Sequence, residues 1–153
     1  MTGPMKNMLL NGSSAYVREA SAADSASLQG VYLKTRVERF HWLDASQLRE
    51  SDFDRDTAGE KIWLAELDGR VIGFVSVWLP DNFIHHLFVL PEFSGQKVGS
   101  ALLAVCLGAI GRPAQLKCLS ANLEALQFYL AKGWKTISKG FSADGEYHLM
   151  QKD

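Results

Sequence analysis

Apolar and polar residues alternate or gather in short blocks along most of the chain, and glycine and proline separate these blocks. Residues 62–67 and 71–78 are two such blocks, and they flank Asp68-Gly69, a dipeptide that favours the tight turn of a β-hairpin. Similar blocks bounded by turn residues predict further strands at 15–20, 83–90, 116–120, 134–139 and 146–151.

Apolar residues at helical spacing predict four helices between these strands. The third is apolar nearly all round, which is typical of a buried helix. The order of elements (strand, two helices, three strands, helix, strand, helix, two strands) predicts an α/β domain. The expected helices run from the caps at 21–24 to residue 42, from 45 to 56, from 100 to 111 and from 122 to 132.

The chain has 153 residues, a length that suits one domain, and we expect this domain to span residues 15–153. Residues 1–14, with glycine, proline and serine around a short apolar run, are predicted to be a flexible N-terminal arm. The longest apolar run, residues 101–110, has about half of the ~20 residues that cross a bilayer. We therefore expect a cytoplasmic protein without a targeting signal or a membrane partner.

Charge and cysteine content narrow the class of protein further. Sixteen Lys and Arg against seventeen Asp and Glu give a net charge of −1, which does not support a nucleic-acid-binding surface. Cys106 and Cys118 both lie in apolar runs, so we expect small buried hydrophobic residues in a reducing compartment rather than a disulfide.

The segment 87–103 places a predicted strand, a loop with Gly95 and Gly99, and a helix directly after one another. Unpaired N–H groups at a helix start bind phosphate oxygens, and the helix dipole adds partial positive charge there. Lys97 adds a cation at the rim of this loop. From these residues alone, a phosphate site and a plain structural turn remain equally good interpretations.

A second pattern follows from Asn122 to Trp134, where Asn122 and Tyr129 stand seven residues apart, two turns along one helical face. Together the two segments resemble the GNAT superfamily of acyl-CoA-dependent N-acyltransferases. Residues 96–101 (QKVGSA) match its pyrophosphate loop, (Gln/Arg)-x-x-Gly-x-(Gly/Ala). Residues 122–134 match its pattern Asn-x-x-Ala-x-x-Phe-Tyr-x-x-x-Gly-(Phe/Trp), and the element order fits from residue 15 to the C-terminus.

The resemblance implies a mixed, mostly antiparallel seven-stranded sheet flanked by four helices. It also implies an acetyl-CoA site in which backbone groups hold the pyrophosphate. Many members have glycine at the position of Lys97, and we expect a side chain that points to solvent to be tolerated there. The implied pyrophosphate-binding residues are Gln96, Lys97, Val98, Gly99, Ser100 and Ala101.

The remaining cofactor residues follow from the same resemblance. Phe88 and Val89 would pair with the pantetheine arm and the acetyl carbonyl, because neighbouring strands splay there in this family. Asn122 would contact the pantetheine and Phe128 would line the groove. Tyr129 would lie near the sulfur, where a phenol with a pKa near ~10 suits the proton donor to the leaving thiolate. The alternative role for Tyr129 is that of a core tyrosine at helical spacing.

The attacking amine needs a base. His85 stands eleven residues before Gln96, where bases of this family tend to lie. Strand alternation puts His85 on the face of Leu87 and Val89, and His86 on the opposite face with Phe88. A histidine pKa near ~6.5 suits proton acceptance at neutral pH. Deprotonation of the amine by solvent is an equally good hypothesis.

Other kinds of site have less support. A zinc site at His85-His86 is disfavoured because adjacent strand residues point to opposite faces, so we predict no metal. A nucleophile elbow, a Walker loop and a dinucleotide fingerprint do not occur in the sequence.

For the acceptor we expect a small primary amine, attacked directly within a ternary complex by a monomer or homodimer. Trp42 is the aromatic residue that we expect to shape its pocket. Attraction of a cationic amine is one interpretation of the acidic residues of segment 45–56, but a charged, solvated face is the better one. A protein or peptide N-acetyltransferase has the same motifs, and a non-catalytic acyl-CoA-binding regulatory module is a further alternative. An open acidic groove favours a peptide and a closed aromatic pocket favours a small amine.

Overall fold

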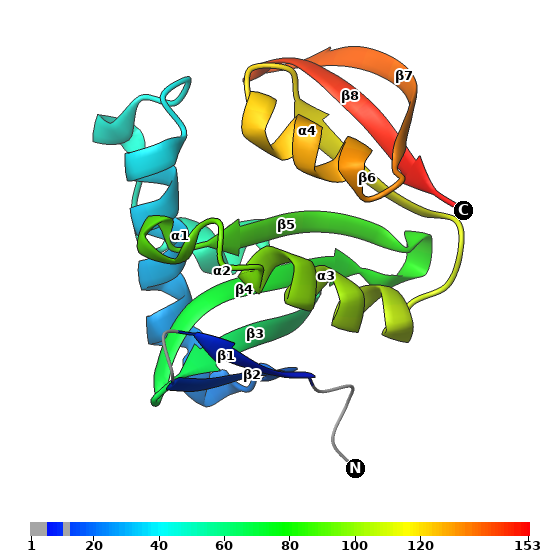
Figure 1. Ribbon diagram of the computed structural model, residues 1–153. Coiled ribbons are helices and arrows are strands. Elements are labelled where there is room, and N and C mark those ends of the chain that lie inside the picture. Colours follow the sequence, from blue (N-terminus) through cyan, green and yellow to red (C-terminus); the bar gives the residue numbers. More distant parts are fainter. Residues whose placement is uncertain (1–5, 11–12) are drawn as a thin grey trace.

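A computed structural model describes residues 6–10 and 13–153, and within these residues one mixed sheet of eight strands carries four α-helices (Figure 1). The strand order is β1-β2-β3-β4-β5-β6-β8-β7, and every neighbouring pair is antiparallel except β5–β6. The strands are β1 Lys6–Leu10, β2 Ser13–Glu19, β3 Lys61–Leu67, β4 Arg70–Trp78, β5 Phe83–Val89, β6 Ala114–Leu119, β7 Lys135–Ser142 and β8 Gly145–Lys152. The helices are α1 Ser25–Arg39, α2 Asp52–Asp56, α3 Val98–Ala109 and α4 Leu123–Ala131.

Strand β4 is the centre of the core because it is buried on both faces. Phe74 packs edge-on against Tyr32 of α1 and Phe53 of α2. A Cβ atom at its neighbour Gly73 would lie 3.2 Å from Leu102 of α3. Since successive strand residues face opposite sides, α1 and α2 cover one face of the sheet and α3 covers the other.

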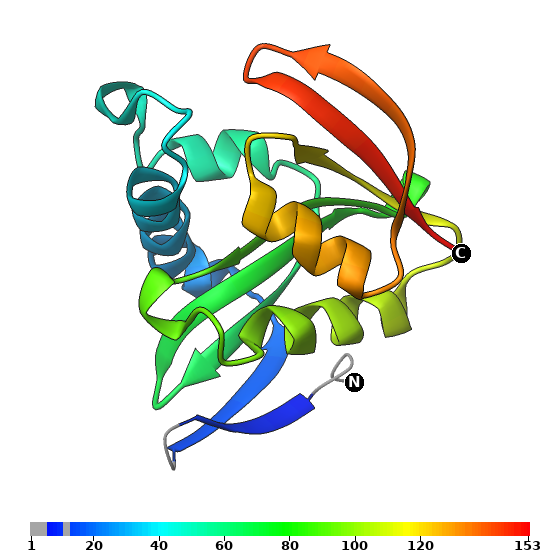
Figure 2. The ribbon, with the colours of Figure 1, turned by 45° about the horizontal axis from the view of Figure 1, so that its top comes forward.

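The pairing between β5 and β6 is short. It consists of Phe83↔Gln115 and Ile84↔Leu116, whereas β5 stays paired with β4 as far as Val89. In Figures 1 and 2, β6, β7, β8 and α4 accordingly turn away from β2–β5 beyond this junction. One edge of β5 is thus left without a strand partner from residue 85 onward.

The seven predicted strands and four helices occur in the predicted order, and Asp68-Gly69 forms the β3–β4 turn with φ values of 50° and 80°. Segment 45–56 is shorter than expected as an α-helix: a 3₁₀ turn covers Ala45–Gln47, and only Asp52–Asp56 is α-helical. Helix α3 begins at Val98, two residues before the predicted start.

The predicted arm over residues 1–14 lies partly outside the described residues. Within the described part, Lys6–Leu10 differ from the expectation because they pair with β2 as the strand β1. This pairing gives the edge of β2 hydrogen-bond partners that it would otherwise lack.

Both cysteines are free and buried, as predicted from their apolar surroundings. In the part of the chain that the structure describes, no helix has the length and apolar character needed to traverse a bilayer.

Candidate active site

The open edge of β5 presents particular backbone groups. The Leu90 N–H donates to Ile72 O, on the side of β4. Backbone groups of a strand alternate in direction, so those of Phe88 also face β4, while those of Leu87 and Val89 face the open edge. The predicted contact of Phe88 and Val89 with a pantetheine arm is not tested by this geometry, but on the open edge the backbone groups of Leu87 and Val89, not those of Phe88, lack a strand partner.

The glycine-containing loop leads from this edge into α3. Lys97 is the N-cap of α3 and has φ 68° and ψ 15°, the left-handed conformation that glycine adopts with least strain. This geometry explains why glycine commonly stands here in the family that the sequence resembles. The first turn of α3 contains no acidic residue. The N–H groups at its start therefore form a place for an anion without a competing carboxylate.

The side chains of the predicted phosphate loop divide into two groups. Val98 and Ala101 are buried in the core and anchor the first turn of α3. A Cβ atom at Gly99 would lie 3.7 Å from Val89 Cγ2 and 3.8 Å from Phe128 Cζ. Gly99 thus brings the helix start close to both the β5 edge and α4. Gln96 and Ser100 are partly exposed, and Lys97 is exposed.

Helix α4 carries the second predicted group. Asn122 is its N-cap, and the side-chain oxygen accepts a hydrogen bond of 3.3 Å from the Ala125 N–H. The oxygen of Asn122 therefore stabilises the helix start, so the structure gives it a capping role besides the predicted contact with pantetheine. Phe128 is partly buried and lies 5.3 Å from the Tyr129 ring.

Tyr129 is 8 % exposed and packs edge-on against Trp134, with ring centroids 5.8 Å apart. Burial, and next the nearby Cys118 and Cys106 thiols, raise the pKa of the Tyr129 phenol above its ordinary value. The hydroxyl is therefore protonated throughout the neutral range. Cys118 stands two residues beyond Leu116, the last residue of β6 that pairs with β5. Tyr129 thus lies next to the strand that forms one side of the split.

The two histidines correct the prediction based on strand alternation. Ser76 pairs with His86 and the next residue, Val77, pairs with Ile84, so His85 is an extra residue in a β-bulge. The bulge brings the two imidazole rings to 4.0 Å between centroids. The argument that adjacent strand residues cannot share a partner therefore fails at this position. His85 is also the first residue of β5 beyond its pairing with β6.

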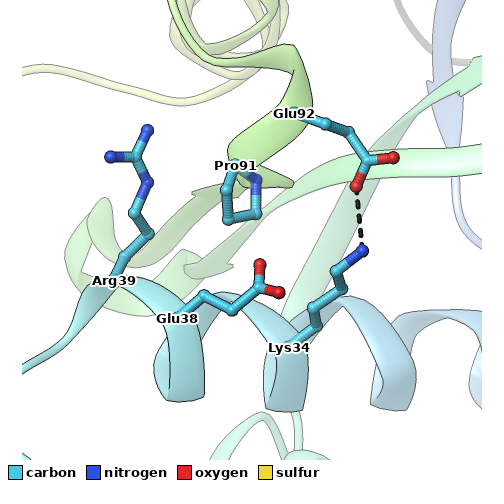
Figure 3. A pocket seen from close by; sticks show the side chains of 5 residues that line it. All are labelled: Lys34, Glu38, Arg39, Pro91 and Glu92. Carbon is cyan, nitrogen blue, oxygen red and sulfur yellow. Dashed lines mark hydrogen bonds and ion pairs between the residues drawn. The ribbon is translucent and has the colours of Figure 1, made fainter.

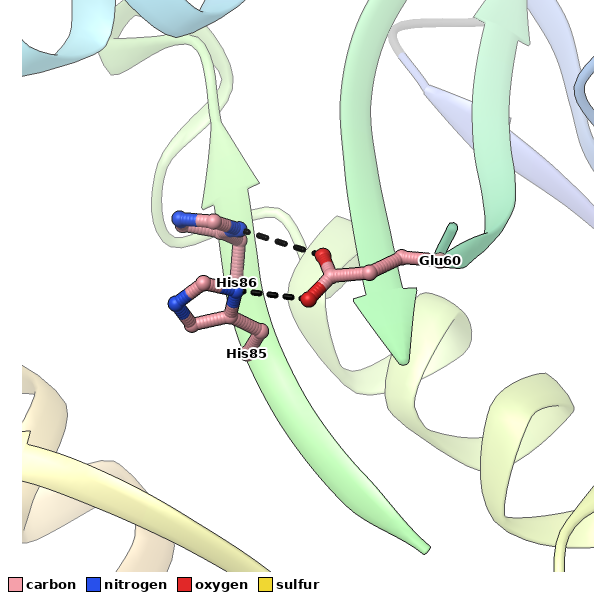
Figure 4. Close-up of side chains that lie close together, drawn as sticks. All are labelled: Glu60, His85 and His86. Atoms are coloured by element: carbon pink, nitrogen blue, oxygen red, sulfur yellow. Dashed lines mark hydrogen bonds and ion pairs between the residues drawn. The ribbon is translucent and has the colours of Figure 1, made fainter. Parts of the chain in front are cut away.

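Glu60, which sequence reasoning missed, lies immediately before β3 and faces both rings (Figure 4). Its Oε2 is 2.6 Å from His85 Nδ1, and its Oε1 is 3.8 Å from His86 Nδ1. The hydrogen bond to Glu60 is the main cause that raises the pKa of His85 above its ordinary value. Twenty-five residues separate the pair in sequence. Since the bulge creates this contact, no local pattern announces it.

His86 belongs to a buried network on the α1 side of the sheet. Its Nδ1 is 2.8 Å from Ser76 Oγ, and its Nε2 is 3.4 Å from the Tyr32 hydroxyl, which donates to Asp56 at 2.7 Å. Burial lowers the pKa of His86 to about 3. His86 is therefore neutral at physiological pH and suits a structural role better than proton transfer.

A row of rings runs from the end of α1 toward the histidines. Trp42 stacks on Phe40 at 4.7 Å, Phe40 meets Phe88 edge-on at 5.1 Å, and Phe88 lies 5.5 Å from His86. Trp42 is partly exposed at the outer end of this row.

The acidic residues of α2 are occupied by internal partners. Asp52 is buried and pairs with Arg36 and Arg55, while Asp56 accepts from Tyr32 and Arg55. Because these partners compensate the negative charges of Asp52 and Asp56, we do not expect either carboxylate to attract a cationic acceptor strongly.

A hollow of about 670 Å³ lies between α1 and the loop after β5 (Figure 3). Its walls are charged and open: Lys34 pairs with Glu92 at 2.9 Å, and Arg39 reaches Ser94 Oγ at 2.6 Å. Arg39 also lies 3.9 Å from Glu124 of α4, so it links α1, the loop and α4. The lining residues are Lys34, Glu38, Arg39, Pro91 and Glu92.

Comparison with known proteins agrees with this arrangement. The acetyltransferase (GNAT) domain family matches residues 58–136. An uncharacterized N-acetyltransferase of Archaeoglobus fulgidus is 30% identical over 146 residues, which cover 81% of this chain and 97% of that protein. The peptidyl-lysine N-acetyltransferase YiaC of Escherichia coli is 24% identical over 127 residues, with coverage of 79% and 84%. A crystal structure of a GCN5-related N-acetyltransferase from Rhodopseudomonas palustris has a TM-score of 0.75 at 19% identity, over 97% and 99% of the two chains.

Proposed function

The chain belongs to the GNAT acetyltransferase family, and we propose that it moves the acetyl group of acetyl-CoA to a primary amine by direct attack in a ternary complex. Membership makes it an acetyl-CoA-dependent N-acetyltransferase. The reaction course, the residues and the acceptor are the parts that we propose.

The observation that carries the proposal is the split between β5 and β6. The outward-facing backbone groups of Leu87 and Val89 lie on an edge without a strand partner, so they suit the amide groups of a pantetheine arm. The split lies directly before the loop and the start of α3, where Gln96, Lys97 and the first turn would hold the pyrophosphate through N–H groups. Gly99 contributes no side chain between the edge of β5 and the start of α3, so a cofactor could pass close to the backbone there. Phe128 would line this path.

Acetyl-CoA supplies an activated acetyl group as a thioester. An alkylammonium with a pKa near ~10.4 must first lose a proton, and His85 Nε2 would accept it. The neutral amine nitrogen then forms a bond to the carbonyl carbon, and the carbon–sulfur bond breaks with its electron pair on sulfur. Tyr129 would donate the proton that converts the leaving thiolate into a thiol, and the acylated nitrogen would return its surplus proton to the tyrosinate. The net products are then the amide, the thiol and the proton held by His85.

For the acceptor, we propose a small primary amine with an apolar portion. The partly exposed Trp42 and the ring of Phe40 supply an aromatic wall that leads to the histidines. Apolar and aromatic walls with few polar groups are typical of small-molecule sites.

A lysine side chain of a protein is the second candidate. The similarity to a peptidyl-lysine N-acetyltransferase favours it, and so does the open, charged hollow beside α1. A lysine residue carries the same alkylammonium group, so the proton transfers proposed above are unchanged.

The experiment has two stages. Titration of the protein with acetyl-CoA in a calorimeter should give saturable heat. Thiol release should then be followed with small amines, polyamines, amino acids and lysine peptides as acceptors. Small amines should give the higher kcat/KM, and higher values for lysine peptides would favour the second candidate. Absence of both heat and thermal stabilisation by acetyl-CoA would overturn the proposal.

Replacement of His85 by alanine should lower kcat roughly a hundredfold, the usual scale for a general base, and should remove the acidic limb of the pH profile. His86→Ala is the matched comparison, because it removes the neighbouring ring. If His86→Ala alone abolishes turnover, the base has been assigned to the wrong residue. If neither change matters, solvent deprotonates the amine.

A further inference from the structure

The carboxylate of Glu60 is buried beside the proposed base. Its side chain is 7 % exposed, and it lies between the turn closed by the Glu60 N–H and Thr57 O and the start of β3. Among the described residues, its Oε1 atom is buried and has no hydrogen-bond partner. A buried carboxylate oxygen without a donor is unfavourable, so its position needs an explanation.

The hydrogen bonds among the described neighbours of Glu60 leave one group, the imidazole of His85, that can donate a hydrogen bond to its carboxylate. Tyr32 donates its proton to Asp56, so its oxygen is free to accept the Nε2–H of His86. His86 Nδ1 then accepts from Ser76 and has no proton to offer Glu60. The contact of 2.6 Å to His85 Nδ1 is the remaining short contact, and it has the length of a charge-assisted hydrogen bond.

We propose that Glu60 positions the base: its buried carboxylate accepts the Nδ1–H of His85 and thereby leaves Nε2 unprotonated toward the acceptor amine. This inference rests on the proposed function. In Figure 4 the second ring nitrogen of His85 points away from Glu60, as this arrangement requires. The tautomer of a histidine is set by the hydrogen bond of its other nitrogen.

The proton balance of the step is simple. The ammonium gives one proton to Nε2, which turns His85 into an imidazolium and the acceptor into a neutral amine. Both ring nitrogens then carry protons, and the Glu60 carboxylate forms an ion pair with the ring. The charge that develops on His85 is therefore neutralised within hydrogen-bonding distance.

The other charged groups around His85 are few. Asp56 of α2 acts in the same direction as Glu60 and raises the pKa of His85, whereas burial and Lys117 of β6 lower it. His86 is the remaining titratable neighbour and stays neutral over the working range, because burial lowers its pKa to about 3. Glu60 is the group with the largest effect, so its removal should be visible in the titration of His85.

The competing interpretation is a cation held by Glu60, His85 and His86, whose ligand atoms lie within 4.8 Å of one another. The hydrogen bonds argue against it, because the Nδ1 atoms of both rings already have partners. A cation would have to displace the Ser76 hydroxyl and the Nδ1 proton of His85.

Nitrogen-15 NMR of the wild-type imidazoles tests the proposal without any substitution. We expect the Nδ1–H tautomer for His85 and a pKa above ~6.5. Glu60→Gln should lower this pKa, because it removes the group that raises it most. Glu66→Gln is the control, because it removes a hydrogen-bonded carboxylate from β3, the strand that begins directly after Glu60. An Nε2–H tautomer in the wild type, or an unchanged His85 pKa in Glu60→Gln, would overturn the proposal.

Kinetics separate the positioning role from a structural one. Glu60→Gln should lower kcat about tenfold to a hundredfold and move the acidic limb to lower pH, with an unchanged KM for acetyl-CoA. If the NMR coupling is present but His85→Ala keeps full turnover, the base assignment fails and the pairing of Glu60 with His85 stands. If Zn²⁺ at micromolar concentration stabilises the wild type but not Glu60→Gln, the three residues form a metal site and the positioning role is wrong.

Discussion

The phenol of Tyr129 is held away from solvent by Trp134 and Phe128. Because burial raises its pKa above the ordinary value of about 10, the group does not titrate where the enzyme would work. Tyr129→Phe should therefore lower kcat about a hundredfold and leave the acidic limb of the pH profile in place.

The ring of phenylalanine keeps the packing against Trp134, so the melting temperature should change little. Measurement of kcat and kcat/KM between pH 5.5 and 9.5 checks this, with thermal unfolding as the control. Unchanged kcat in Tyr129→Phe would mean that this residue is only a core tyrosine.

Burial of His86 makes the stability of the protein depend on pH. Its native pKa of about 3 lies below the value near ~6.5 in an unfolded chain, so between these values the unfolded chain binds one proton more. The free energy of unfolding should therefore decrease as the pH is lowered through this window, by at most about 1.4 kcal/mol per pH unit from this residue. The effect of His85 on the free energy of unfolding has the opposite sign, because its native pKa is raised. Its stabilising contribution is fully present below pH ~6.5 and is lost as the pH rises through the native pKa.

Urea unfolding at pH 7, 6, 5 and 4 tests the effect of His86. His86→Gln should reduce the slope of the free energy of unfolding against pH relative to the wild type. Equal slopes in the two proteins would show that His86 takes up a proton in the native state.

Helix α3 begins beside the proposed cofactor path, where Gly99 lies close to Val89 and Phe128. Gly99→Ala adds only ordinary contacts to Val89 and Phe128 and should stabilise the helix by about 0.5–1 kcal/mol. Gly99→Leu places a long side chain in the proposed cofactor path. It should weaken acetyl-CoA binding at least tenfold while the protein stays folded.

Gly108 offers a matched control in the same helix, since a Cβ atom there meets no atom within 4 Å. Gly108→Leu should leave the dissociation constant for acetyl-CoA, measured by calorimetry, unchanged. Similar affinities for Gly99→Leu and the wild type would place the cofactor elsewhere.

At the level of elements, the sequence predicted the order of strands and helices because local periodicity and turn residues determine it. The hairpin at Asp68-Gly69 is the clearest case. The bulge at His85 was missed because it is a mismatch between two strands, and alternation within β5 alone cannot reveal it. Glu60 was missed for the same reason, since only the bulge brings His85 to it.

At the level of the whole molecule, β6–β8 and α4 form a block whose strand pairing with β5 consists of two residue pairs (Figure 2). Acetyl-CoA that enters between them should replace the missing strand contacts along β5. The amide of Val89 should therefore exchange its hydrogen at least tenfold more slowly when acetyl-CoA is bound.

Phe88 supplies an internal control, because its amide faces β4 and not the open edge. Amide exchange followed by NMR with and without acetyl-CoA measures both residues in one sample. If Val89 exchanges equally fast in the complex, the cofactor does not use this edge.

The burial of the two cysteines near Tyr129 has a consequence for redox chemistry. Burial raises the pKa of the Cys106 thiol to about 12 and that of the Cys118 thiol to about 11. Disulfide exchange requires a thiolate, and at pH 7 a thiol with a pKa of 11 is ionised in only about one molecule in ten thousand. The thiols of Cys106 and Cys118 should therefore react very slowly with the disulfide form of coenzyme A. We expect the enzyme to keep its activity when much of the coenzyme A around it is oxidised.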